Sequence, residues 1–231
     1  MPEPTSPLNL VVVAHPDDEI LGFGGTGAKL VSNGERVCAI VISGAVNART
    51  LRPTSEELNH DILAANHLLG FDEPILGSFP NIKLNTVPHL ELVQFIEEQI
   101  VRLKPTRIFT HHDGDLNDDH LQVARACLAA SRLPQRRPEL PRLRSVHSLE
   151  IPSSTDWAFP GMYPSFAPNT FFEIESFLEK KIEALMCYRH VMRPFPHPRS
   201  REALTGLAAM RGAQAGLRYA EAFVTLYQIG L

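Results

Sequence analysis

The strongest constraint on the fold is an unbroken apolar run over residues 10–14 that ends directly against the letters HPDDE. Its centre, Val11–Val13, is a run of β-branched residues, which is typical of a strand covered on both faces of a parallel sheet. HPDDE, residues 15–19, then places an imidazole and three carboxylates at the carboxyl end of that strand. Ligands of open α/β sheets bind at this end. We therefore expect a functional site directly after the first strand.

Short apolar runs alternate with amphipathic segments along the first two thirds of the chain. The pattern predicts strands over 36–42, 75–76, 106–110 and 145–151, and helices over 24–33, 54–70, 87–103 and 121–132. Such alternation implies right-handed crossovers and a mostly parallel sheet between two helix layers. We expect a Rossmann-like three-layer α/β fold with strand order 3-2-1-4-5. In that order a crevice opens between the carboxyl ends of strands one and four.

The 231 residues, 44% of them hydrophobic, suffice for one domain over 1–231. Its core is expected over 1–151, and 152–231 forms an extension of helices and a strand. Within the extension we expect a loop over the site at 152–172, helices at 173–189 and 200–216, and a terminal strand at 222–229. The proline-rich segment 134–141 is predicted to be an exposed loop.

Charge and cysteine usage exclude several classes of protein. A net charge of −4 with both signs interspersed provides no basic stripe, so nucleic acid is not an expected partner. No apolar stretch approaches the ~18 residues of a membrane span, and the first residues lack the pattern of a signal peptide. The three cysteines are odd in number and widely spaced, so we expect reduced thiols and a cytoplasmic protein.

A second polar motif, THHDGDLNDDH, follows the fourth predicted strand and ends at His120. With His15 and Asp18, this histidine offers two imidazoles and one carboxylate, a set that suits Zn²⁺ with an open fourth position. Ligand type alone does not exclude Fe²⁺ or another divalent ion. A water at an open zinc position has its pKa lowered toward ~7, and Asp17 is placed to take its proton.

The glycines of GFGGTG also match the dinucleotide fingerprint GxGxxG. That fingerprint needs its first glycine directly after the strand and an acidic residue at the end of the second strand. Here HPDDEIL precedes Gly22, and the second strand is followed by the neutral residues 42–45. We therefore interpret the glycines as close-packing or turn positions.

The chain resembles the PIG-L/LmbE-like family of zinc-dependent N-deacetylases in three motifs: HPDDE, the GFGGT that follows it, and THHDGDLNDDH. The resemblance extends over KPTRIFTHH, IPSSTDW and PFPHPRS, and so over nearly the whole chain. It implies hydrolysis of an N-acetyl group on an amino sugar of the N-acetylglucosamine type. It also implies zinc at His15, Asp18 and His120, with Asp17 as the general base. Family members often form trimers or hexamers, so a homo-oligomer is expected by resemblance.

One position departs from the family pattern. Some members carry a histidine three residues before the second metal histidine, where this chain has Asn117. An amide can donate a hydrogen bond but cannot supply a proton to the leaving nitrogen. The candidate general acid is His197 in the stiff PFPHP turn, and the alternative is Asp17 once it is protonated.

The same resemblance suggests where the substrate binds. Arg49 matches the family's loop arginine, expected to bind substrate oxygens, with Arg52 as the fallback. Asn117 is expected to hydrogen-bond to the substrate, and Trp157 either stacks on a sugar face or anchors the loop. Glu19 is expected to steady the HPDDE turn. Four residues are candidates to support the metal-bound imidazoles: His111, His112, Asp115 and Asp119.

Two other functions stay open at this point. One is an amidase that acts on another small-molecule amide, such as a thiol conjugate. The other is a metabolite- or nucleotide-binding module that keeps the fold without turnover. Asp17 stands beside three intact candidate ligands, which favours the catalytic interpretation.

Overall fold

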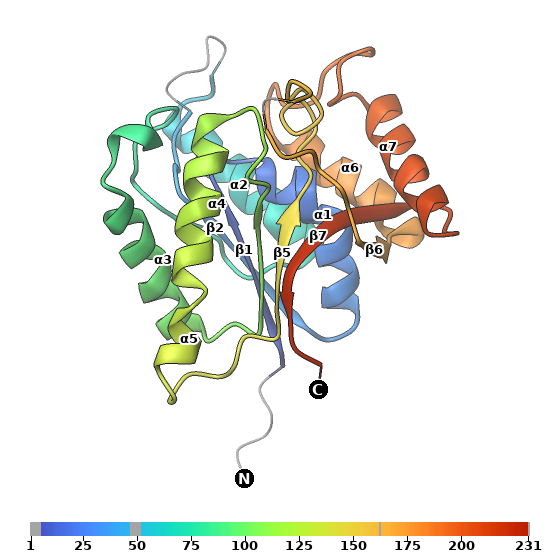
Figure 1. Ribbon diagram of the computed structural model, residues 1–231. Coiled ribbons are helices and arrows are strands. Elements are labelled where there is room, and N and C mark those ends of the chain that lie inside the picture. Colours follow the sequence, from blue (N-terminus) through green and yellow to red (C-terminus); the bar gives the residue numbers. More distant parts are fainter. Residues whose placement is uncertain (1–5, 47–51, 162, 231) are drawn as a thin grey trace.

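The computed structural model describes residues 6–46, 52–161 and 163–230. Its strands form one sheet of order β3-β2-β1-β4-β5-β7-β6 (Figure 1). The first five are parallel, and β7 runs antiparallel to β5 and β6. The strands are β1 (Leu8–Val13), β2 (Arg36–Val41), β3 (Ile75–Leu76), β4 (Arg107–His111), β5 (Ser145–Leu149), β6 (Thr170–Glu173) and β7 (Ala220–Gln228). The predicted α/β class and the order 3-2-1-4-5 are confirmed.

Helices cover both faces of the sheet. They are α1 (Asp18–Ser32), α2 (Ser55–Leu69), α3 (His89–Leu103), α4 (Asp118–Ala130), α5 (Leu133–Arg136), α6 (Leu178–Cys187) and α7 (Arg201–Gln214), with 3₁₀ turns at Leu84–Thr86 and Glu175–Phe177. One face packs against α1, α2 and α6, and the other packs against α3 and α4 (Figure 1). Among the residues described, no helix combines the length and apolarity needed to cross a bilayer.

The central strand β1 contributes to both apolar layers. Val11 and Val13 pack into the cluster under α1 and α2, whereas Leu10 and Val12 pack into the cluster under α3 and α4. All four side chains are fully buried. Because alternate residues point to opposite faces, a strand buried on both sides is apolar at most positions. The polar exception in β1 is the buried Asn9, whose Nδ2 donates to Glu35 and to the Arg36 carbonyl.

The neighbours β1 and β4 set the location of the crevice. They pair in parallel with Val12 opposite Thr110, so their carboxyl ends lie side by side. The connection after β1 leads into α1 on one face of the sheet, and the connection after β4 leads into α4 on the other. The segments that begin at Ala14 and at His112 therefore meet at one edge, as the strand order predicts.

The sequence pattern predicted that the first helix begins at Gly24. In the structure α1 begins six residues earlier, at Asp18. Asp17 occupies the N-cap position, and Asp18 and Glu19 fill the first turn, where the positive end of the helix dipole favours carboxylates. Glycine normally weakens a helix, but these glycines sit at close contacts. A Cβ atom on Gly27 would lie 2.3 Å from Cζ of Phe71. The close-packing interpretation of GFGGTG is confirmed.

Three segments after α4 differ from the expected elements. The predicted loop over 152–172 ends in β6, whose Thr170 pairs with Phe223 of β7, a long-range pairing that leaves no local periodicity. Helix α6 starts at Leu178, later than the predicted residue 173, because β6 and a 3₁₀ turn occupy the intervening residues. The short helix α5 overlaps the segment 134–141, which was predicted to be a loop.

Candidate active site

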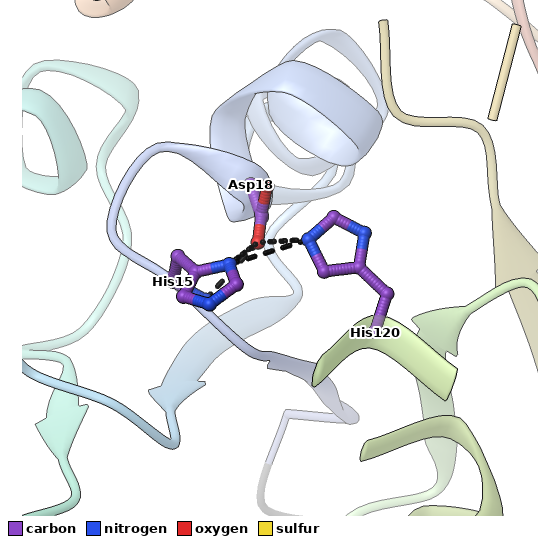
Figure 2. Close-up of side chains that lie close together, drawn as sticks. All are labelled: His15, Asp18 and His120. Atoms are coloured by element: carbon purple, nitrogen blue, oxygen red, sulfur yellow. Dashed lines mark hydrogen bonds and ion pairs between the residues drawn. The ribbon is translucent and has the colours of Figure 1, made fainter. Parts of the chain in front are cut away.

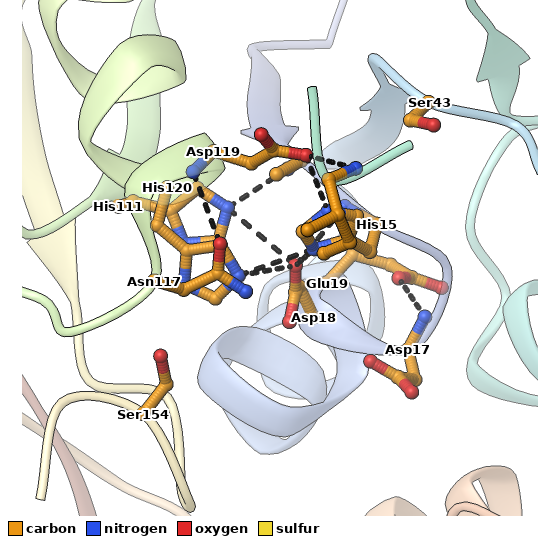
Figure 3. A network of polar contacts seen from close by, with 12 residues as sticks. His15, Asp17, Asp18, Glu19, Ser43, His111, Asn117, Asp119, His120 and Ser154 are labelled. Carbon is orange, nitrogen blue, oxygen red and sulfur yellow. Dashed lines mark hydrogen bonds and ion pairs between the residues drawn. The ribbon is translucent and has the colours of Figure 1, made fainter. Parts of the chain in front are cut away.

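The HPDDE turn is shaped by an unusual backbone conformation at Asp17. This residue has φ 100° and ψ −27°, in the left-handed region, which costs a non-glycine residue about 1–3 kcal/mol. The buried carboxylate of Glu19 accepts a hydrogen bond from the Asp17 N–H at 3.1 Å and so holds the turn. As a result, Asp17 and Asp18 point in different directions (Figure 3).

Glu19 is itself held from two other elements. Its Oε1 atom accepts hydrogen bonds from Nδ2 of Asn66 in α2, at 3.0 Å, and from the hydroxyl of Tyr188 after α6. Burial is the main reason that its pKa is raised to about 7. The expected role of Glu19 as a support of the turn is confirmed.

The three candidate metal ligands converge from two segments that are far apart in the chain (Figure 2). His15 Nδ1 lies 3.3 Å from His120 Nε2 and 3.4 Å from Asp18 Oδ2, and His120 Nε2 lies 3.2 Å from Asp18 Oδ2. A tetrahedral ion with bonds of ~2.0–2.2 Å separates its ligand atoms by roughly 3.3–3.6 Å. All three residues are buried, and their spacing fits one such ion.

Asp119 orients the imidazole of His15. Its Oδ2 atom lies 3.0 Å from His15 Nε2, the ring nitrogen that does not face the other two candidate ligands. The same carboxylate accepts backbone N–H groups of Ile82 at 2.7 Å and Leu84 at 2.9 Å. Figure 3 shows the Asp119 carboxylate beside the His15 ring. A carboxylate behind a metal-binding imidazole fixes the orientation of the ring and increases its basicity.

Asp115 stands in the same relation to His120. Its Oδ2 atom lies 3.2 Å from His120 Nδ1. Hydroxyl groups of Ser154 and Thr155 donate to this carboxylate, which links the loop after β5 to the site. The sequence named Asp115 and Asp119 as candidate supports, and the structure places each against a different imidazole.

The other two histidines of the second motif have different surroundings. His111 stacks on His120 with ring centroids 3.8 Å apart, and its Nε2 accepts the Ala14 N–H at 2.8 Å. Burial and the charge of His120 lower the pKa of His111 to about 3, so its ring is neutral at pH 7. His112 lies 3.0 Å from the carbonyl oxygen of Pro164 and contacts the loop that follows β5.

The electrostatics of the cluster favour a cation. Burial lowers the pKa of His120, but Asp18 and Asp115 outweigh that effect and raise it to about 10. Burial raises the pKa of Asp18, but His120 outweighs it and holds the value well below the usual range. The carboxylates therefore stabilise a positive charge at this point, and a metal that binds here displaces a proton.

A cleft of about 260 Å³ opens above these groups. His15, Asp18, His120 and Asp17 line it from the two motifs. The other lining residues come from four loops and are Asn81, Ile82, Asn117, Ser153, Ser154 and Arg199. This volume lies slightly below the range of about 300–1,000 Å³ that is usual for small-molecule sites, so the cleft suits a small ligand.

Arg199 is the charged lining residue that the sequence analysis did not name, and the uncharged ones are Asn81, Ile82, Ser153 and Ser154. Its Nη1 atom lies 3.2 Å from Oδ2 of Asp17, and its Nε donates to Oγ of Ser153 at 2.7 Å. It belongs to the motif PFPHPRS, in which the sequence indicated His197 as the functional residue. An arginine fixed among prolines was the signal that could have identified it.

Of the remaining predicted site residues that the structure describes, Asn117 lines the cleft, whereas His197 and Trp157 do not. The half-buried His197 accepts the Arg199 N–H through Nδ1 at 3.0 Å, and its ring packs edge-on against Trp157. Neither His197 nor the exposed Trp157 lines the cleft. Asn117 lines it and caps α4, because its Oδ1 accepts the Asp119 N–H at 3.0 Å. Arg49 lies outside the described residues.

Comparison with known proteins places this site in a family context. Residues 10–131 match the family model described as PIG-L, GlcNAc-PI de-N-acetylase. The uncharacterized deacetylase YaiS of Escherichia coli (strain K12) is 28% identical over 189 residues, covering 76% of this chain and 87% of YaiS. The conserved protein TT1542 from Thermus thermophilus has 27% identity and a TM-score of 0.77, with 96% of both chains covered.

A more distant structure extends the likeness in fold. The N,N'-diacetylchitobiose deacetylase from Pyrococcus horikoshii superposes with a TM-score of 0.73 at 21% identity. The match covers 95% of this chain and 83% of that protein. At this level of identity the likeness establishes a shared fold.

The contact between Asp119 and His15 generates a test of the metal centre. We expect Asp119→Asn to weaken zinc affinity by about 10–100-fold, because His15 loses its carboxylate partner. Competitive titration of zinc against a chelator measures this change. The matched control is Asp118→Asn, since Asp118 is the exposed neighbour on the same helix turn, and it should bind zinc like the wild type. Equal affinities for the two variants would contradict the assignment.

Proposed function

The chain belongs to the PIG-L family, and from this premise we propose that it is a zinc-dependent N-deacetylase. Its substrate is an amino sugar or a metabolite that contains one, and its products are acetate and a free amine. The observation that carries the proposal is the convergence of His15, Asp18 and His120 at one cleft that also contains the Asp17 carboxylate. The names of YaiS and of the Pyrococcus horikoshii protein, both deacetylases, support it.

His15, Asp18 and His120 are the residues that would hold the metal. Bound there, zinc supplies Lewis-acid chemistry that polarises the acetyl carbonyl and lowers the pKa of water. The protein's own contribution is the rigid placement of these three groups, since Asp119 and Asp115 hold the two imidazoles from behind.

Asp17 is the proposed general base. A water molecule attacks the carbonyl carbon, and one of its protons passes to the Asp17 carboxylate. The strained turn fixes this carboxylate beside the ligand set without making it a ligand. The carbon–nitrogen bond then breaks, and the nitrogen takes up a proton to leave as an amine.

We assign the return of that proton to Asp17. His197 accepts a backbone N–H through Nδ1, and burial together with Arg199 and Arg193 lowers its pKa, which disfavours the protonated form that an acid needs. Arg199 remains charged and cannot act as the acid. Its guanidinium orients the Asp17 carboxylate and presents a charged donor to oxygens of the substrate.

The cleft walls suit a hydroxylated substrate. Asn81, Asn117 and Ser153 bring amide and hydroxyl groups from three loops to the rim. Asn117 uses its side-chain oxygen in the cap of α4, so its amide nitrogen is the group that can donate to a sugar oxygen. These groups favour an amino sugar over an apolar amide.

Acetate release from a panel of amides tests the proposal. Zinc-loaded protein is offered N-acetylglucosamine, its nucleotide-linked form and its glycan-linked form. We expect acetate from at least one of them, and we expect Asp17→Asn to bind zinc normally while losing roughly 10²–10⁴-fold in rate. Bound zinc and tight nucleotide binding with no acetate from any amide would favour a binding module. An unchanged rate in Asp17→Asn would remove Asp17 from the mechanism.

The assignment of the acid is tested by a pair of variants in the same turn. Arg199→Ala is expected to lower kcat/KM by at least about 100-fold, since it removes a charged hydrogen bond to the base inside the cleft. His197→Ala is expected to stay within about threefold of the wild type, because its side chain lies outside the cleft. Steady-state kinetics on the best substrate decide the matter, with zinc content measured in both variants. A fall of about 1,000-fold in the kcat/KM of His197→Ala with zinc retained would instead assign the role of general acid to His197.

A further inference from the structure

The backbone of α1 forms hydrogen bonds with a buried ion pair, Lys181 and Glu221, that comes from the extension. In a regular helix the N–H of Gly25 donates to the carbonyl of Leu21, four residues earlier. Here the Gly25 N–H lies 2.9 Å from Oε1 of Glu221, and the next N–H, of Thr26, lies 2.7 Å from Oε2. Lys181 Nζ donates to the Leu21 carbonyl at 2.7 Å. The Glu221 carboxylate thus contacts the donor, the Gly25 N–H, and the Lys181 ammonium contacts the acceptor, the Leu21 carbonyl, of the same helical hydrogen bond.

The two side chains reach α1 from elements that are distant in sequence. Lys181 lies in α6 and Glu221 in β7, and both elements pack against α1 (Figure 1). Their charged groups lie 2.7 Å apart, and the side chains are 8% and 7% exposed. The pair is therefore shielded from water at the point where it meets the helix.

The glycine run of α1 makes this contact sterically feasible. A Cβ atom on Gly24 would lie 3.2 Å from Cγ of Lys181, and one on Gly25 would lie 3.0 Å from Ile174. Larger residues would push the extension away from the helix. GFGGTG thus creates the space in which Lys181 and Glu221 reach the backbone.

Stability alone is a weak explanation for such a pair. Moving two charges out of water is unfavourable, and well-packed apolar residues of similar volume are often as stabilising or more so. A charged pair can instead fix geometry, because an ammonium and a carboxylate bind backbone carbonyl and N–H groups directionally. The first turn of α1 is where geometry matters most.

One residue connects the pair to the catalytic turn. Leu21 donates its N–H to the carbonyl of Asp17 at 2.9 Å, and its own carbonyl is held by Lys181. Asp17, Asp18 and Leu21 belong to the same helical turn. A shift at the Leu21 carbonyl is therefore transmitted directly to the proposed base and to one proposed metal ligand.

We propose that Lys181 and Glu221 are positioning residues that fix the first turn of α1, and with it the carboxylates of Asp17 and Asp18, for metal binding and catalysis. The catalytic part of this inference rests on the proposed function. The part that concerns the metal centre does not depend on which amide is hydrolysed.

The experiment compares Lys181→Met and Glu221→Gln with a matched control on the same helix. Lys29 pairs with Glu173 at 2.8 Å, but that pair is partly exposed and lies at the far end of α1, so Lys29→Met is the control. Lys181→Arg retains the charge and serves as the conservative variant. Each protein is assayed for zinc affinity, for the visible absorption spectrum of its Co²⁺ form, and for kcat and KM.

Both test variants should bind zinc at least about tenfold more weakly and show an altered Co²⁺ spectrum, because Asp18 is displaced. Their kcat should fall at least about tenfold. Their KM should stay within about threefold of the wild-type value, since most of the residues that line the cleft come from other elements. Lys181→Arg should recover most of the loss, and Lys29→Met should match the wild type in every measurement.

The inference is overturned if folded Lys181→Met and Glu221→Gln retain wild-type zinc affinity, Co²⁺ spectrum and kcat, even with a lower melting temperature. Should a single variant fail to fold, the double variant Lys181→Met/Glu221→Gln, which leaves no unpaired buried charge, is judged by the same criteria. If the wild type binds zinc but releases no acetate from any amide, the deacetylase proposal fails. The zinc affinities and Co²⁺ spectra then still decide the positioning role.

Discussion

The parallel pairing of β1 with β4 is the constraint on which the rest of the site depends. It fixes Val12 opposite Thr110 and so brings two strand ends together, although His15 and His120 are 105 residues apart in sequence. Because α1 and α4 lie on opposite faces of the sheet, the two connections meet at this edge and line a cleft between them. A cluster of imidazoles and carboxylates can therefore be buried at the edge of an otherwise apolar sheet.

Burial of so many ionisable groups is tolerable only because each has a partner. Asp119 and Asp115 contact the outward nitrogens of the two candidate ligand imidazoles, and both carboxylates also accept backbone or hydroxyl hydrogens. An excess of negative charge remains, which raises the pKa of His120 to about 10 and favours a cation between His15, Asp18 and His120. The same network that stabilises the fold locally thus prepares the proposed metal centre.

The sequence predicts those parts of the fold and site that arise from local patterns. The valine run of β1 indicated a strand buried on both faces. Alternation indicated a parallel sheet, and the Rossmann-like order assumed for it placed the motifs after β1 and β4 side by side. Contacts made by the extension leave no such pattern. Arg199 approaches Asp17 across 182 residues of sequence, and β6 exists only because β7 pairs with it. The start of α1 was placed too late because HPDDE was interpreted as a turn, whereas its last two residues form the first turn of the helix.

The central claim is that strand pairing builds a metal centre of two imidazoles and one carboxylate. X-ray absorption at the zinc edge of protein loaded with one equivalent of zinc tests it most directly. The account predicts only nitrogen and oxygen neighbours at about 2.0–2.2 Å, with the scattering of two imidazoles that falls to one in His120→Ala. A sulfur neighbour near ~2.3 Å, or an imidazole count that His120→Ala leaves unchanged, would contradict it.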